Sequence, residues 1–241
     1  MLIDELLTYL FDGQSHLLAT PMATWLASSR RFTAFVTACR DKIRKKVRTT
    51  QDQENLLDLR LELETAYLLL QEKSLNVEYE PQRSERVRHP DFAVTFTTSL
   101  TFMVEVTRLR VDQKSNPIDP TIPLTGERLA DAVCSKLGQL FPQRSNVLLV
   151  GIGVLHLTQS DVRDAMVRIQ QRAERGDPTF LQRYEFRDRA DFFGHYQRLS
   201  EIIVRGSELQ TGETVIGWIN PQGKYPLPSK VRTALYRSHS I

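Results

Sequence analysis

Residues 91–108 read DFAVTFTTSLTFMVEVTR, and the fold class is inferred from this segment outward. Its two halves, 91–96 and 101–108, are rich in Val, Phe and Thr, the residue types that favour β-strands. The link between them, 97–100, is short and mostly polar, as in the connection of a β-hairpin. The stretch therefore predicts two antiparallel strands.

The segments around this hairpin alternate between the periods of strands and helices. A strand is predicted just before it, over 76–80. Further elements are predicted after it in the order helix, strand, helix, strand, strand, over 126–141, 146–154, 158–175, 199–204 and 214–219. The run at 146–154 is continuously apolar, as expected for a strand that is covered on both faces. This order predicts an α/β fold with a mixed central β-sheet flanked by helices.

The first 75 residues are predicted to be helical. Ser28 or Ser29 is suited to cap a helix that runs to about Val47, and a long helix is predicted over 52–73. We therefore expect an added N-terminal helical segment, 1–50, followed by the α/β domain, 51–241.

Two acids of the hairpin are candidates for a functional site. Glu105 lies in the middle of a strand among apolar residues, and a buried carboxylate is costly unless it is paired or binds a metal. Asp91 opens the preceding strand, and the start of one hairpin strand lies near the end of the other. The two carboxylates can therefore stand close together, where a cation would relieve their repulsion. The alternative is an exposed face on an edge strand.

Two helices offer further candidates. Glu64 interrupts the leucine stripe Leu57, Leu61 and Leu68 of the long helix, so it is predicted to point inward, whereas Glu62 falls on the polar face. The alternative is that Glu64 lies at the margin of a wide apolar arc. Lys136 and Gln139 share one face of the helix over 126–141, although most such residues face solvent.

Taken together, these segments resemble the PD-(D/E)xK nuclease superfamily, which has a restriction-endonuclease-like fold. The resemblance covers about residues 52–154 and rests on the order of four pieces, ELETAYLLLQ, HPDFAVTF, TFMVEVTRLR and CSKLGQLF. It implies an acidic helix, a hairpin that carries Pro-Asp and then the second acid, and a helix with Lys or Gln. The implied activity is Mg²⁺-dependent (or Mn²⁺-dependent) hydrolysis of phosphodiester bonds, with DNA as the expected partner. Such nucleases often dimerise, so a homodimer is also open.

The resemblance also implies roles for individual residues. Asp91 and Glu105 would bind the metal, and Glu64 would join them directly or through water. The family's Lys stands two residues after the second acid, where this chain has Thr107. Threonine carries no charge, so Lys136 on the following helix is expected to supply the ammonium group, with Gln139 beside it.

The departure at Thr107 leaves several readings open. If no ammonium group replaces the missing Lys, the domain is catalytically inactive and binds nucleic acid or a protein partner. Arg108 is a weaker substitute because strand alternation places it on the face opposite Glu105. His89 is either an auxiliary base or an ordinary loop histidine. A toxin or defence role is neither favoured nor excluded.

Composition narrows the class of protein. A formal net charge of +3 does not diagnose nucleic-acid binding, and the basic residues crowded over 30–48 form either a solvated helix face or a phosphate-contacting surface. The two cysteines, Cys39 and Cys134, are far apart and lack a His/Cys cluster, which argues against zinc. No signal-peptide pattern or run of about 20 apolar residues occurs. We therefore expect a cytoplasmic protein.

Overall fold

The computed structural model describes residues 2–50, 52–81, 90–110, 124–153, 157–206 and 215–239. Within these residues, the strands form one sheet in the order β1-β2-β3-β4-β5-β6. Their bounds are Leu75–Tyr79 (β1), Phe92–Phe96 (β2), Leu100–Leu109 (β3), Asn146–Ile152 (β4), Leu199–Gly206 (β5) and Ile216–Ile219 (β6). β3, β4 and β5 are parallel, and the outer strands pair antiparallel with their neighbours. The predicted α/β fold with a mixed sheet is confirmed.

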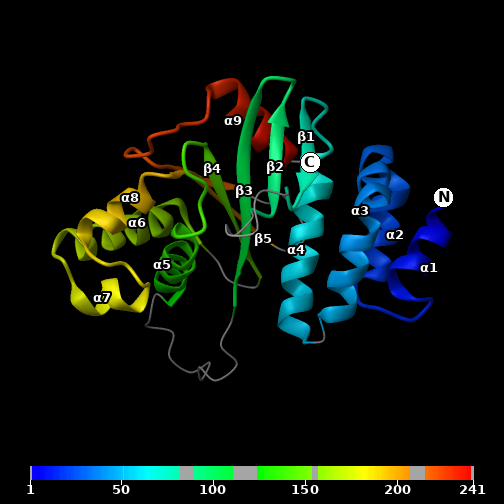
Figure 1. Ribbon diagram of the computed structural model, residues 1–241, viewed down its shortest axis with the longest axis horizontal. Coiled ribbons are helices and arrows are strands. Elements are labelled where there is room, and N and C mark those ends of the chain that lie inside the picture. The colour runs from blue at the N-terminus through cyan, green and yellow to red at the C-terminus, as the bar shows by residue number, and fades with distance from the viewer. Residues whose placement is uncertain are drawn as a thin grey trace.

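Along the chain, helices precede the sheet, connect β3 to β4 and β4 to β5, and follow β6. Their bounds are Ile3–Phe11 (α1), Ala19–Ser28 (α2), Arg30–Thr49 (α3), Gln53–Leu69 (α4), Leu124–Leu137 (α5), Gln159–Glu174 (α6), Pro178–Arg183 (α7), Arg189–Tyr196 (α8) and Ser229–Ser238 (α9). The N-terminal helices α1–α3 lie at one end of the molecule beside α4, and α6–α8 lie at the other end (Figure 1). The predicted N-terminal helical segment is therefore present.

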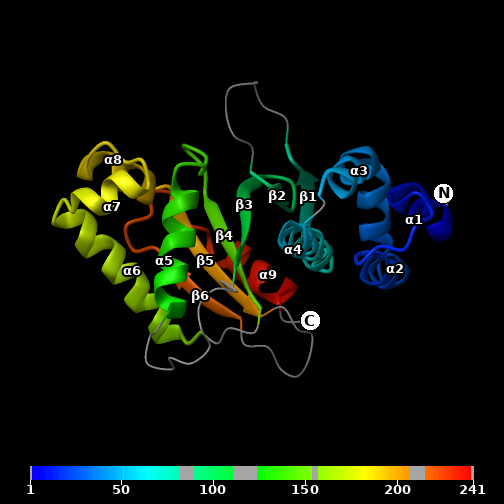
Figure 2. The ribbon, with the colours of Figure 1, turned by 90° about the horizontal axis from the view of Figure 1, so that it is seen from below.

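Alternation along the buried strand β4 divides the core into two clusters. Val147 and Leu149 pack with residues of α4 and α9, whereas Leu148 and Val150 pack with residues of α5 and α6. The sheet is thus covered on both faces, which explains why β4 is apolar throughout. Figure 2 shows α5 and α9 on either side of the strands.

The N-terminal helices share the first of these clusters. Ser29 caps α3 by accepting a 3.3 Å hydrogen bond from the backbone N–H of Phe32. The ring of Trp25 stacks on Tyr67 of α4 with 5.8 Å between centroids. The cluster runs without a break from α1 to α4 and into the sheet. The domain boundary between residues 50 and 51 stays a prediction.

Two further properties concern the described part of the chain. None of its helices combines the length and the apolar character needed to cross a membrane. Cys39 and Cys134 are both free thiols.

Candidate active site

The β2–β3 hairpin holds Asp91 and Glu105 together through backbone hydrogen bonds. β2 pairs with β3 only as far as Phe92 opposite Val104, so β3 continues past the start of β2. Asp91 lies at this point, and its Oδ2 accepts a 2.7 Å hydrogen bond from the backbone N–H of Val106. The backbone N–H of Asp91 in turn stabilises the Glu105 carboxylate by a hydrogen bond. The predicted proximity of the two acids follows from this exchange.

Lys136 of α5 reaches the same place from the neighbouring helix. Its Nζ donates to Glu105 Oε1 at 2.6 Å, and the Glu105 side chain is 6% exposed. Gln139, just beyond α5, accepts from the same ammonium group through Oε1 at 3.4 Å. The sequence predicted that α5 would supply a cation near the acids, and the structure places one in direct contact with Glu105.

Glu64 lies elsewhere, and the expectation that it joins Asp91 and Glu105 is wrong in its geometry. Its Oε1 accepts a 2.9 Å hydrogen bond from Arg205 of β5, and both side chains are almost fully buried. The reason is that α4 is buried on nearly every side between Leu61 and Ala66. On such a helix an inward-pointing residue can face any of several neighbours, and Glu64 faces β5.

Glu62 occupies the position that was predicted for Glu64. Two residues along an α-helix differ by about 200° in direction, so Glu62 points away from β5. It lines the same cavity as Asp91 and Lys136, and its Oε1 accepts a 2.7 Å hydrogen bond from Lys46 of α3. Lys46 also contacts Glu80 at 2.7 Å. The N-terminal helical segment therefore contributes an ammonium group to this cluster.

Burial and mutual repulsion perturb the three acids. Burial, together with the charge of Glu105, raises the pKa of Asp91 to about 7. Burial, together with the charge of Asp91, raises the pKa of Glu62 to about 7. Burial also raises the pKa of Glu105, against the opposing effect of Lys136. Carboxyl groups poised near neutral pH are typical of functional sites.

A cavity of about 580 Å³ opens onto these groups between α4, β3 and α5. Asp91, Glu62 and Lys136 line it, as does Thr107, which stands two residues after Glu105. Thr107 is half-buried and offers a hydroxyl group. The cavity therefore combines carboxylates, an ammonium group and a neutral hydrogen-bonding side chain.

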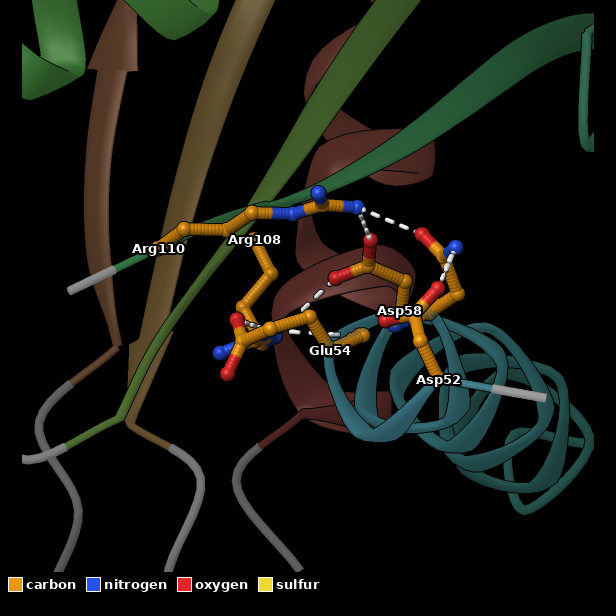
Figure 3. A network of polar contacts seen from close by, with 6 residues as sticks. Asp52, Glu54, Asp58, Arg108 and Arg110 are labelled. Atoms are coloured by element: carbon orange, nitrogen blue, oxygen red, sulfur yellow. Dashed lines mark hydrogen bonds and ion pairs between the residues drawn. The ribbon is translucent and has the colours of Figure 1, made fainter. Parts of the chain in front are cut away.

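Arginines at the end of β3 fix the α4 wall of this cavity (Figure 3). Arg108 faces α4, opposite to Glu105 as predicted, and donates to Asp58 Oδ1 at 3.0 Å and to the carboxylate of Glu54. Arg110 donates to the Asp58 carboxylate and to Asn55 Oδ1, the latter at 2.8 Å. These bonds tie the first turns of α4 to the end of β3.

The donor set is suited to one divalent cation. Among the described residues, no group of three or more His, Cys, Asp or Glu side chains is close enough to hold a metal. Mg²⁺, however, usually takes one or two protein carboxylates and keeps several waters, so Asp91 and Glu105 suffice. When ionised, the three acids exceed the ammonium groups of Lys46 and Lys136 by one charge. The oxygen ligands and this excess negative charge both fit Mg²⁺.

Comparisons with known proteins found no relative of this chain. No family model matches the chain, and no curated protein or solved structure matches it. The resemblance to PD-(D/E)xK nucleases therefore stays a prediction. His89, the suggested auxiliary base, lies outside the described residues.

Proposed function

We propose that this protein is a Mg²⁺-dependent nuclease that hydrolyses phosphodiester bonds, with DNA as its expected substrate and the cytoplasm as its location. The observation that carries the proposal is that Lys136 of α5 contacts Glu105 of β3 beside Asp91, which directly precedes β2. Asp91 and Lys136 line one cavity. These residues are far apart along the chain, and each belongs to a type that phosphoryl-group chemistry uses.

The residues divide into cation ligands and charge-stabilising groups. Asp91 and Glu105 would hold Mg²⁺ or Mn²⁺, which when bound lowers the pKa of a water molecule and stabilises negative charge on the phosphate. Lys136 offers its ammonium group as a hydrogen-bond donor to a phosphate oxygen on which charge develops. Thr107 contributes a neutral hydroxyl to the cavity wall. Lys46 pairs with Glu62 and with Glu80 and so offsets part of the negative charge of the cluster.

A cleavage assay tests the proposal. The wild type is incubated with plasmid, linear duplex and single-stranded DNA and with RNA, in Mg²⁺, in Mn²⁺ and in a chelator. We expect metal-dependent cleavage that Asp91→Asn, Glu105→Gln and Lys136→Met each reduce by about 100-fold or more, the scale of one charge-stabilising group. Asp164→Asn, at an exposed carboxylate of α6, is the matched control. Absence of cleavage of every substrate with both metals would reject the proposal.

One observation favours a second function, a catalytically inactive domain that binds nucleic acid or a protein partner. Lys136 contacts Glu105 directly and so already neutralises a carboxylate that a metal would use. Thr107 also leaves the family's lysine position without a charge. An inactive domain would bind DNA in a salt-dependent way. That binding would persist in Asp91→Asn, and the wild type would not cut.

A further inference from the structure

A second cavity, of about 360 Å³, lies between α5, α6 and α7. Four arginines line it and form what we call the arginine groove: Arg168, Arg172, Arg175 and Arg183. The acids in its lining are Glu127 and Asp131 of α5. The four arginines therefore exceed these two acids, and the groove carries net positive charge.

Acidic side chains pair with only two of the four arginines. Arg172 pairs with Asp177 at 2.9 Å, and Arg183 pairs with Asp131 at 2.8 Å. Arg168 and Arg175 are exposed, and across the described part of the chain they form neither a hydrogen bond nor an ion pair through their side chains. Two guanidinium groups thus stay available for a ligand. Their planar donors match the geometry of a phosphate group.

The arginine groove adjoins the candidate active site across a single helix. Asp131 lines both cavities, so α5 forms the ridge between them. Lys136 is five residues further along α5, which corresponds to about 7.5 Å of helix rise. Arg168, Arg172 and Arg175 follow each other at helical spacing along α6 and its C-terminal cap, so their side chains form one row. A chain lying in the active-site cavity can therefore pass over α5 and continue along this row.

We propose that the arginine groove binds the phosphate backbone of the nucleic acid strand whose scissile bond lies beside Asp91, Glu105 and Lys136. This inference rests on the proposed function and adds the path that the substrate takes on the protein. Arg168 and Arg175 contact phosphates away from the bond that is cut. They hold the strand in register, and because they contact only the backbone they bind it regardless of base sequence.

The test measures binding apart from cleavage. The full chain carrying Asp91→Asn is titrated, in a chelator, into fluorescently labelled duplex DNA over a range of salt concentrations, and anisotropy is recorded. The variant Arg168→Ala/Arg175→Ala is compared with Arg163→Ala/Arg189→Ala, which removes two other exposed arginines from the same half of the molecule. We expect the groove variant to bind about 10-fold more weakly, with the slope of log K against log salt reduced by about 2. The control should bind like the parent.

The outcomes separate this inference from the proposed function. In the catalytically intact protein, the groove variant should raise KM and leave kcat unchanged. If the wild type cuts DNA and both double variants bind equally, the arginine groove is not the path and the nuclease proposal stands. If the wild type does not cut but the groove variant alone loses DNA binding, the groove is supported and catalysis is rejected. Absence of DNA binding by the parent at low salt would overturn the groove as well.

Discussion

Replacing Asp91 with Asn should stabilise the metal-free protein while abolishing its proposed activity. The raised pKa of Asp91, about 7 instead of 3.8, means that the folded protein disfavours the ionised carboxylate. Asn has the same shape and can still accept the hydrogen bond from the backbone N–H of Val106. The substitution therefore removes the charge and keeps the local geometry.

The size of the effect follows from the pKa difference. A shift of about 3 units corresponds to about 4 kcal/mol at pH values above 7, since each unit is worth about 1.4 kcal/mol. Asp91 is half-buried and solvent reduces its repulsion with Glu105. We therefore expect a gain of about 2 kcal/mol in the free energy of unfolding at pH 8.

The effect of Asp91 on stability depends on pH. Because the pKa of Asp91 is raised on folding, the folded protein keeps a proton that the unfolded chain loses above about pH 4. The stability of the wild type therefore falls, through this group, as pH rises from about 4 to about 7, and the penalty is constant above that range. The advantage of Asp91→Asn over the wild type should be largest at pH 8 and should vanish near pH 4.

Urea unfolding in a chelator, followed by circular dichroism at both pH values, measures this difference. Asp164→Asn, at an exposed site, is the control and should change little at either pH. Added Mg²⁺ should stabilise the wild type at pH 8 by mass action and leave Asp91→Asn unchanged. If Asp91→Asn is less stable than the wild type at pH 8 without metal, the carboxylate has a structural role and our reasoning fails.

Two other buried charges give further predictions. Glu64→Gln removes one partner of the buried Arg205–Glu64 ion pair and should lower the free energy of unfolding by about 3–5 kcal/mol. Glu64→Leu with Arg205→Met should stay close to the wild type, and urea unfolding compares the two variants. Equal losses in both variants would contradict this view of the pair. Lys46→Met removes the partner of Glu62 and should cost about 1–3 kcal/mol at pH 8, but less near pH 5, where Glu62 is protonated. A loss independent of pH, measured by thermal unfolding at both values, would assign the effect to the Glu80 pair or to packing and not to Glu62.

The parts of the site that lie on one hairpin or one helix face were predictable from the sequence. Strand alternation and the hairpin connection placed Asp91 beside Glu105, because both rules act over a few residues. Helix periodicity predicted that Lys136 and Gln139 lie on the same side, and their side chains are in contact although α5 ends at Leu137. The short helices α7 and α8, of 6 and 8 residues, were not predicted, since so few residues carry a weak periodic signal.

The choice between Glu62 and Glu64 was not predictable from α4 alone. A helix covered on one side has one inward face, and its apolar stripe reveals that face. α4 instead lies between α3 and the sheet, and acids pointing in different directions are both buried. Which of them meets Asp91 depends on where β5 and β2 lie around the helix.

The mixed α/β sheet, the hairpin that joins Asp91 and Glu105, and the helix that carries Lys136 could all be predicted from the sequence. That Glu62 and Lys46 complete the cluster, and that Glu64 pairs with Arg205, emerges only from the folded chain. The two kinds of feature differ in the distance along the chain over which their interactions act. Backbone pairing and helix periodicity are local and leave a pattern in the sequence. The partner of a buried charge, in contrast, is set by the packing of α3 and α4 against the sheet, which joins residues far apart along the chain.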